Sequence, residues 1–344
     1  MNIHNLPNVK EVTNKRLGDV DVGALIEAGE PIILRQAYKD KALVKAGLKS
    51  IKNAQDFIRG FYSDAPLTAF MAPPDCKGRF FYKDDISAMN CEASQMSLEA
   101  FFECLELSGG RDDKPSYYAG STDIQTFFPK MIEADNLDLP GDIFKQYPPL
   151  MSIWMGNKTT AAIHYDMSHN IAACMVGRRT FTLFPPDQIS NLYPGPLFPT
   201  PAGQVVSMVD LNDPDFEVYP DFKKALSTAQ IAKLEPGDVL IYPAMWWHQV
   251  EAQDDFNVLI NYWWNEAPRF MDSPMNSVFY AMLALRDRSP AEKAAWKNIF
   301  DYYVFGDAEQ PRSHLPDVAY GPLGPMDIQT SRRLRQMLIN KLNR

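Results

Sequence analysis

Cysteine is scarce in this sequence, and histidine and cationic residues are scarce as well. The 344 residues include four cysteines, and no two of them form a Cys-x-x-Cys pair. This pattern argues against a zinc ribbon, an iron–sulfur cluster or a redox dithiol. We therefore expect four reduced thiols, at Cys76, Cys91, Cys104 and Cys174.

Long hydrophobic runs are also missing. Residues 1–19 are mostly polar, without the apolar stretch of a signal peptide. No later apolar stretch approaches the roughly 20 residues that a membrane-spanning helix needs. The sequence therefore predicts a cytoplasmic protein with no membrane partner.

Positive charge is in deficit. Lysine and arginine together number 34, against 43 aspartates and glutamates, which gives a net charge of −9 and an isoelectric point near 5.1. The net negative charge of the molecule repels the phosphate backbone of a nucleic acid. The charge therefore disfavours nucleic acid as a partner.

Hydropathy patterns divide the chain into three parts. Residues 1–115 mix helical spacing, as at Ser97 to Leu107, with short extended runs, and they predict a helical wrapper that contributes a strand or two. Residues 116–270 alternate apolar and polar residues, as in Arg179 to Phe184, which predicts a β-sandwich or barrel. Within this core, the proline-rich stretch from Pro185 to Asp221 is expected to be an ordered loop that covers a site.

The last part of the chain, residues 271–344, returns to helical patterns. They fall at Pro274 to Arg286, Pro290 to Phe300 and Ile328 to Leu342. The third pattern carries an apolar stripe with arginine and lysine around it. Such a face commonly packs against the body of the protein or against a second subunit.

Five histidines occur in the sequence, so their positions are informative. His164 and Asp166 stand two residues apart in a segment with strand character, and this spacing sends both side chains to one face. His248 ends a predicted strand that begins after the turn at Pro236 to Asp238. Two imidazoles and one carboxylate form the facial triad of non-haem Fe(II) oxygenases. The sequence therefore predicts an iron site at His164, Asp166 and His248.

The same alternation places further residues around this site. Asn170 shares the inward face of His164 and Asp166. On the next predicted strand the apolar residues are odd-numbered, so Arg179 turns inward with them. A buried arginine needs an anion, and the carboxylate of a ligand would satisfy it. The remaining histidines, His4, His169 and His314, are expected to be structural or surface residues.

Several motifs along the chain occur together in a known family. They are His164-Tyr165-Asp166, Phe184-Pro185-Pro186-Asp187-Gln188, Pro236-Gly237-Asp238-Val239-Leu240, Trp246-Trp247-His248 and Asn261-Tyr262-Trp263. From about Pro31 to Asn265 the chain resembles the JmjC-type, cupin-like 2-oxoglutarate oxygenases, most closely the subgroup of the asparaginyl hydroxylase that acts on hypoxia-inducible factor. The resemblance implies a mainly β fold, with a double-stranded β-helix (jelly-roll) core, N-terminal helices and a C-terminal helical extension.

The resemblance also implies roles for individual residues. The three candidate metal ligands match the iron ligands of the family. Asn261 matches an asparagine near the cosubstrate, and Asn170 looks like another pocket residue. Tyr118 is similar to the tyrosine that hydrogen-bonds the distal carboxylate of 2-oxoglutarate, with Tyr117 as the alternative. By alternation Trp263 shares the face of Asn261, which predicts that it forms a pocket wall.

Two positions depart from the family pattern. Arg179 stands where the closest relatives place a lysine that holds the distal carboxylate, so the charge is kept and bidentate geometry becomes available. Ala161 replaces a threonine three residues before the first ligand, with Thr159 and Thr160 just upstream. The loss of this hydroxyl bears on the affinity for the cosubstrate.

The function implied by the resemblance is that of an enzyme. It would be a dioxygenase that uses Fe(II), 2-oxoglutarate and O2 to hydroxylate a protein or peptide side chain or a small metabolite. Two alternatives stay open: a non-catalytic metal-binding cupin that senses a small carboxylate, and an RNA-modifying oxygenase. The predicted organisation is an oxygenase domain at residues 1–270, followed by residues 271–344, which resemble in position a dimerising segment and predict a homodimer.

Overall fold

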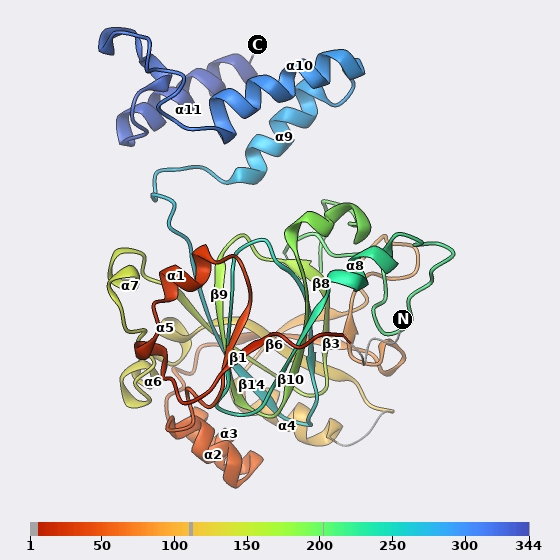
Figure 1. Ribbon diagram of the computed structural model, residues 1–344. Coiled ribbons are helices and arrows are strands. Elements are labelled where there is room, and N and C mark those ends of the chain that lie inside the picture. Colours follow the sequence, from red (N-terminus) through yellow and green to blue (C-terminus); the bar gives the residue numbers. More distant parts are fainter. Residues whose placement is uncertain (1–5, 110–112, 202, 344) are drawn as a thin grey trace. The chain divides into compact units, whose positions relative to one another are not determined.

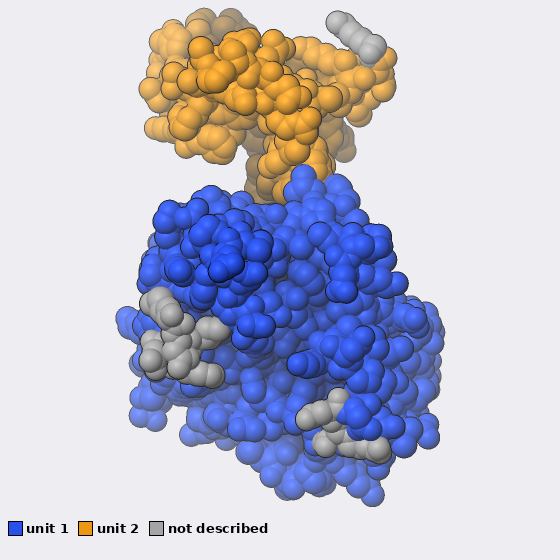
Figure 2. Space-filling model, turned by 90° about the vertical axis from the view of Figure 1, so that its right-hand side faces the viewer, with its two compact units in different colours: residues 1–265 blue, residues 266–344 orange. Residues whose placement is uncertain are grey.

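The computed structural model describes residues 6–109, 113–201 and 203–343. The chain divides into two compact units, residues 1–265 and 266–344, which Figure 2 shows in two colours. This division falls close to the expected boundary at residue 270, while the separate roles of the two parts stay predictions. None of the helices in the described ranges has the length and apolar character needed to cross a bilayer.

The core of the first unit is the expected jelly roll, built from two sheets (Figure 1). The larger sheet has nine strands in the order β1-β2-β12-β9-β14-β7-β6-β3-β5, and the smaller has five in the order β11-β10-β13-β8-β4. The strands of the larger sheet are β1 (Lys10–Val12), β2 (Ile32–Leu34), β12 (Val239–Tyr242), β9 (His169–Val176), β14 (Asn257–Trp264), β7 (Leu150–Gly156), β6 (Ser116–Asp123), β3 (Leu67–Ala72) and β5 (Glu92–Met96). Those of the smaller sheet are β11 (Gln230–Leu234), β10 (Arg179–Phe184), β13 (Trp247–Ala252), β8 (Thr160–Tyr165) and β4 (Arg79–Phe80).

Helices surround these sheets, and the second unit contains further helices. In the first unit they are α1 (Val22–Glu27), α2 (Ala42–Lys49), α3 (Ile51–Arg59), α4 (Leu98–Ser108), α5 (Ile124–Phe127), α6 (Pro129–Ala134), α7 (Asp142–Gln146) and α8 (Phe222–Thr228). Helices α2 and α3 lie side by side (Figure 1). The second unit contains α9 (Pro274–Leu285), α10 (Pro290–Phe300) and α11 (Ile328–Leu342), close to the three ranges that the sequence predicts.

The N-terminal part contains more strand than the sequence indicates. Residues 1–115 contribute five strands, β1 to β5, instead of one or two. Three of these strands, β1, β2 and β4, have two or three residues each, which is too short for alternation to show in the sequence. They form by pairing with partners far along the chain, as β2 does with β12, so tertiary contacts decide their conformation.

Local sequence accounts well for the elements that carry the core. In β10 the odd-numbered Phe181 and Leu183 are buried inside the roll, together with Leu240 and Leu259 from the opposite sheet. Helix α4 begins after Ser97, whose side chain accepts a hydrogen bond from the backbone of Ala100. The inner faces of the sheets thus form an apolar interior, and any polar group inside it needs a partner.

The proline-rich loop from Pro185 to Asp221 contains a 3-10 helix (Pro186–Asn191), and no strand in its described residues. It returns to the smaller sheet, because Val206 forms an isolated bridge with His164 and the backbone of Ser207 donates to the carbonyl of Ile163. The loop is therefore ordered against β8, as expected, at the strand that carries the first predicted metal ligand.

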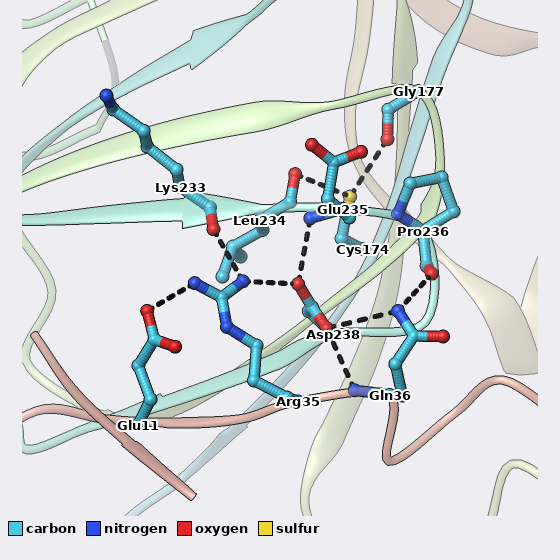
Figure 3. A network of polar contacts seen from close by, with 10 residues as sticks. All are labelled: Glu11, Arg35, Gln36, Cys174, Gly177, Lys233, Leu234, Glu235, Pro236 and Asp238. Atoms are coloured by element: carbon cyan, nitrogen blue, oxygen red, sulfur yellow. Dashed lines mark hydrogen bonds and ion pairs between the residues drawn. The ribbon is translucent and has the colours of Figure 1, made fainter. Parts of the chain in front are cut away.

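A polar network joins the N-terminal strands to the turn before β12 (Figure 3). Asp238, 1% exposed, accepts hydrogen bonds from the Arg35 guanidinium at 2.5 Å, from the backbone of Gln36 at 2.8 Å and from the backbone of Glu235 at 2.9 Å. Arg35 also donates to Glu11 at 2.5 Å, and its hydrogen bonds with Glu11 and then Asp238 raise its pKa. The predicted Pro-Gly-Asp turn is thus tied to β1 and β2 by a buried carboxylate.

We predict that Asp238→Asn lowers the free energy of unfolding by about 3 kcal/mol, because it breaks a buried ion pair and leaves the Arg35 guanidinium short of one partner. Chemical denaturation of the full chain measures the change. The matched control is Glu11→Gln, which removes the more exposed partner of the same arginine and should cost about 1 kcal/mol or less. Equal losses in the two variants would contradict the role given to Asp238.

Candidate metal centre

The three predicted metal ligands meet inside the roll. His164 lies at the end of β8 and Asp166 just beyond it, while His248 lies on β13, directly opposite His164 in the antiparallel pair. One ligand atom from each of the three residues lies within 4.8 Å of the others. Both histidines are buried, at 9% and 2% exposure. The geometry fits one metal ion with two nitrogen ligands and one oxygen ligand.

Backbone carbonyls orient both imidazoles. The Nδ1 atom of His164 lies 2.8 Å from the carbonyl of Ala162, and that of His248 lies 3.0 Å from the carbonyl of Trp246. A carbonyl only accepts, so each Nδ1 carries the proton and each Nε2 keeps a lone pair for a metal. Burial, with a smaller contribution from His164, lowers the pKa of His248 to about 4, so its ring is neutral at neutral pH.

Two neighbouring side chains hold the carboxylate of Asp166, and a third supports one of them. Its Oδ2 atom accepts hydrogen bonds from the Nδ2 of Asn170 and from the indole Nε1 of Trp263, both at 3.2 Å. Asn261 in turn donates its Nδ2 to the Oδ1 of Asn170 at 2.9 Å. Asn170 is completely buried, whereas Asn261 and Trp263 also line the cavity at the metal site. These contacts fix the carboxylate next to the two imidazoles.

Tyr242 is a site residue that the sequence analysis missed. It lies at the end of β12, 2% exposed, and its hydroxyl oxygen lies 3.3 Å from the Nε2 of His248. Burial raises its pKa well above that of a free tyrosine, so the hydroxyl keeps its proton. Its alternation with Leu240 on an inward-facing strand was the available signal, because both side chains point into the roll.

A cavity of about 420 Å³ opens from the metal site. Besides the three candidate ligands, its lining includes the predicted site residues Tyr118, Arg179, Asn261 and Trp263, together with Tyr242. Pro201, Gly203 and Val206 of the proline-rich loop also line it. The loop therefore contributes to the cavity wall, as the sequence predicts.

Arg179 lies in this cavity with few partners. It is 3% exposed, one Nη donates weakly to the carbonyl of Trp154 at 3.5 Å, and its Nε has no acceptor. Among the described residues, no carboxylate forms an ion pair with it, and burial lowers its pKa. A buried guanidinium in this state is costly unless an anion joins it. The structure thus fits a carboxylate ligand at this end of the cavity.

Tyr118 and Tyr117, the two candidates for the tyrosine that binds the cosubstrate, lie in different surroundings. Tyr118 lines it beside Arg179, and burial raises the pKa of Tyr118 to about 12, so its hydroxyl can donate to an anion. Tyr117 instead packs against the hydrophobic core outside the roll, close to Cys104. Ala161 lines the cavity as well, where the family places a threonine, and Thr159 lies on the same side.

Of the remaining histidines, His169 belongs to the first unit and is not among the described residues that line the cavity. The Nδ1 of His169 accepts a hydrogen bond from the backbone of Ala244 at 3.1 Å, and its ring lies against Trp264. His314 is exposed in the second unit. His4 lies outside the described residues.

Comparisons with known proteins identify relatives of this chain. Among relatives in the curated collections, Lysine-specific demethylase JMJ31 of Arabidopsis thaliana is 32% identical over 129 residues, which is 36% of this chain and 23% of that protein. The tRNA wybutosine-synthesizing protein 5 of Danio rerio is 31% identical over 126 residues, 37% of this chain and 33% of that protein. JmjC domain-containing protein C of Dictyostelium discoideum is 31% identical over 157 residues, 44% of this chain and 36% of that protein.

The chain thus spans about a quarter to a third of the length of the curated relatives it matches. The nearer resemblance to the asparaginyl hydroxylase subgroup stays a prediction. The family model of the Cupin-like domain matches residues 21–270, a range that includes every strand of both sheets except β1 and all residues of the metal centre. The chain belongs to the Cupin-like, JmjC-type domain family.

Proposed function

We propose that this protein is an Fe(II)- and 2-oxoglutarate-dependent dioxygenase that hydroxylates a protein or peptide side chain or a small metabolite. One observation carries the proposal: a buried His-Asp-His cluster shares a cavity with a buried arginine that has no carboxylate partner among the described residues. The cluster suits a divalent metal, and the arginine suits the carboxylate of a cosubstrate.

Each residue has a role in this proposal. His164, Asp166 and His248 would hold Fe(II), and iron bound in this way supplies the activation of O2, coupled to the oxidative decarboxylation of 2-oxoglutarate. Arg179 binds the distal carboxylate as a charged fork, and the Tyr118 hydroxyl donates to the same group.

The second group of site residues prepares the cavity for these ligands. Asn170 and Trp263 hold Asp166 in one orientation. Asn261 adds an unpaired Oδ1 atom, which can accept from a bound ligand. The aromatic side chains around them exclude bulk water and so strengthen each of these polar contacts.

Two alternatives predict different behaviour. A carboxylate-sensing cupin would bind metal and ligand without turnover. An RNA-modifying oxygenase gains support from the similarity to tRNA wybutosine-synthesizing protein 5, so the negative net charge alone no longer argues against nucleic acid. Turnover of 2-oxoglutarate in the presence of RNA or of peptide separates these cases from each other.

We further propose that the protein works as a homodimer in the cytoplasm, with the second unit as the dimerising segment. Its helices α9 to α11 expose large apolar side chains, among them Leu283 at 76%, Trp296 at 41% and Leu342 at 54%. Exposed apolar surface of this kind is typical of a protein–protein interface.

The first prediction concerns the metal and the cosubstrate. Anaerobic addition of Fe(II) and then 2-oxoglutarate should produce a visible metal-to-ligand charge-transfer band. His164→Ala should abolish the band because it removes a metal ligand. Arg179→Ala should weaken the affinity for 2-oxoglutarate at least about 30-fold, because a buried charged contact is lost.

Neighbouring residues provide the controls. Arg178→Ala removes the adjacent arginine, which is exposed and paired with Asp254, and His314→Ala removes an exposed histidine of the second unit. Both variants should keep the band and the affinity of the unchanged protein. Tight metal binding without a band would contradict the oxygenase proposal and favour the sensor.

A second prediction concerns the missing hydroxyl. Ala161→Thr should tighten 2-oxoglutarate binding about five- to tenfold, because it adds one hydrogen-bond donor to a buried site. Isothermal titration of the Mn(II)-loaded protein measures the change. Ala161→Val has the same shape without the hydroxyl, so equal gains in both variants would show that packing is the cause.

A third prediction tests the dimer. Sedimentation of the full chain should give twice the mass of one chain, and Leu338→Arg should shift it to a monomer, because a charge enters the apolar stripe of α11. Arg332→Ala, which removes a charge beside the apolar stripe of the same helix, is the control. A monomeric full chain would contradict the proposal.

A further inference from the structure

The cavity has a deep end and a rim of different character. The deep end contains Arg179, His248 and Tyr242, which are at most 3% exposed. At the rim Ser121 and Gly203 are exposed. A substrate that enters from solvent therefore meets the rim residues first and reaches the metal centre afterwards.

Among the described residues, the rim offers no charged side chain to a substrate. The described residues of the cavity lining include two side chains that are charged at neutral pH, Asp166 and Arg179, both inside. The half-buried residues of the lining also include Thr68, Phe70, Cys91 and Pro201, which carry no charge. None of these four residues can neutralise an ion as it leaves water.

The charges inside are committed to other partners in the proposed function. Asp166 is a metal ligand and already accepts from Asn170 and Trp263. Arg179 is assigned to the cosubstrate carboxylate. A cationic substrate group would find no free carboxylate at the metal, and an anionic one would find no free cation.

One wall of the cavity is a row of aromatic rings. Phe80 lies 5.7 Å from Tyr118, Tyr118 lies 5.7 Å from Trp154, and Trp154 lies 5.5 Å from Trp263, as measured between ring centroids. All four side chains line the cavity and are half-buried. This wall offers contact to an apolar or flat group along the cavity, and its last member, Trp263, donates to Asp166.

The backbone of β6 at the rim bulges, and the bulge lies close to one ring of this wall. The pairing of β6 with β7 shifts between Ala119 and Thr122, which marks a bulge, and Ser121 within it has a positive φ of 48°. A Cβ atom at Gly120 would meet the Trp154 ring at 2.9 Å, so glycine lets the bulge approach the ring closely. Strained backbone of this kind is typical of binding sites.

We infer that the substrate group which reaches the metal is uncharged and largely apolar, such as a neutral amino-acid side chain. The inference rests on the proposed function and narrows its substrate class. It sets this chain apart from a lysine-specific demethylase, whose name assigns it a cationic side chain, although the sequence similarity to such a protein is clear.

Pairs of similar probes, one neutral and one charged, test the charge preference without turnover. The protein is loaded with Mn(II) and 2-oxoglutarate, and the paramagnetic relaxation of probe protons is measured by NMR. The first pair is N-acetyl-norleucine amide and N-acetyl-lysine amide, and the second is N-acetyl-glutamine amide and N-acetyl-glutamate amide. The side-chain protons of each neutral member should relax at least about tenfold more than those of its charged partner.

Variants at the rim define the proton relaxation that remains when a probe cannot enter the cavity. Thr68 lines the cavity from β3, and its hydroxyl accepts from the side chain of Gln95 at 2.7 Å. Thr68→Trp should fill the rim and remove the relaxation of every probe, while Thr68→Val should keep it. Thermal melting of both variants shows that the fold is kept.

Other outcomes would overturn the inference. One is a charged probe whose protons relax as strongly as those of its neutral partner. Another is a trimethyllysine amide whose protons relax more than those of norleucine amide, through contact with the aromatic rings. The third is that no probe relaxes more in the unchanged protein than in Thr68→Trp. The protons of 2-oxoglutarate itself report loading. If Mn(II) does not relax them, the proposed function fails instead.

Discussion

The pairing of β8 with β13 is the constraint on which the centre depends. His164 and His248 are 84 residues apart in the chain, and the antiparallel register places them directly opposite each other. A slip of one residue would turn one imidazole to the outer face of the sheet. The register shifts only beyond the histidines, between His248 and Val250, so the irregularity leaves the metal centre intact.

The interior around this pair combines groups that stabilise the fold with groups that weaken it. Phe181, Leu240 and Leu259 fill the roll in the ordinary way. Arg179 and Asn261 each bury a polar atom without a partner, at a cost of about 1–3 kcal/mol for each group. Such a cost is typical of a site whose polar groups await a ligand, and a bound carboxylate would recover it.

Sequence could predict the centre because its residues follow a simple period. His164 and Asp166 are two positions apart, with one residue between them, and alternation along β10 assigns Arg179 to the interior. Contacts between distant segments were beyond reach: Trp263 donates to Asp166 across 97 residues of the chain, and Asn261 donates to Asn170 across 91 residues. The short N-terminal strands escaped prediction for the same reason, since no local pattern produces them.

The two ends of the cavity are built by different means, and this difference bears on how substrate choice can vary. Inward faces of paired strands fix the ligands and Arg179, so a change there alters the core and its stability. A bulge at Gly120 and Ser121 and a proline-rich loop form the rim, where side chains are partly exposed. Substitutions of the exposed side chains of the loop, away from the strained bulge, usually change stability by about 0.5 kcal/mol or less. The rim can therefore accept a different substrate charge while the metal centre stays as it is.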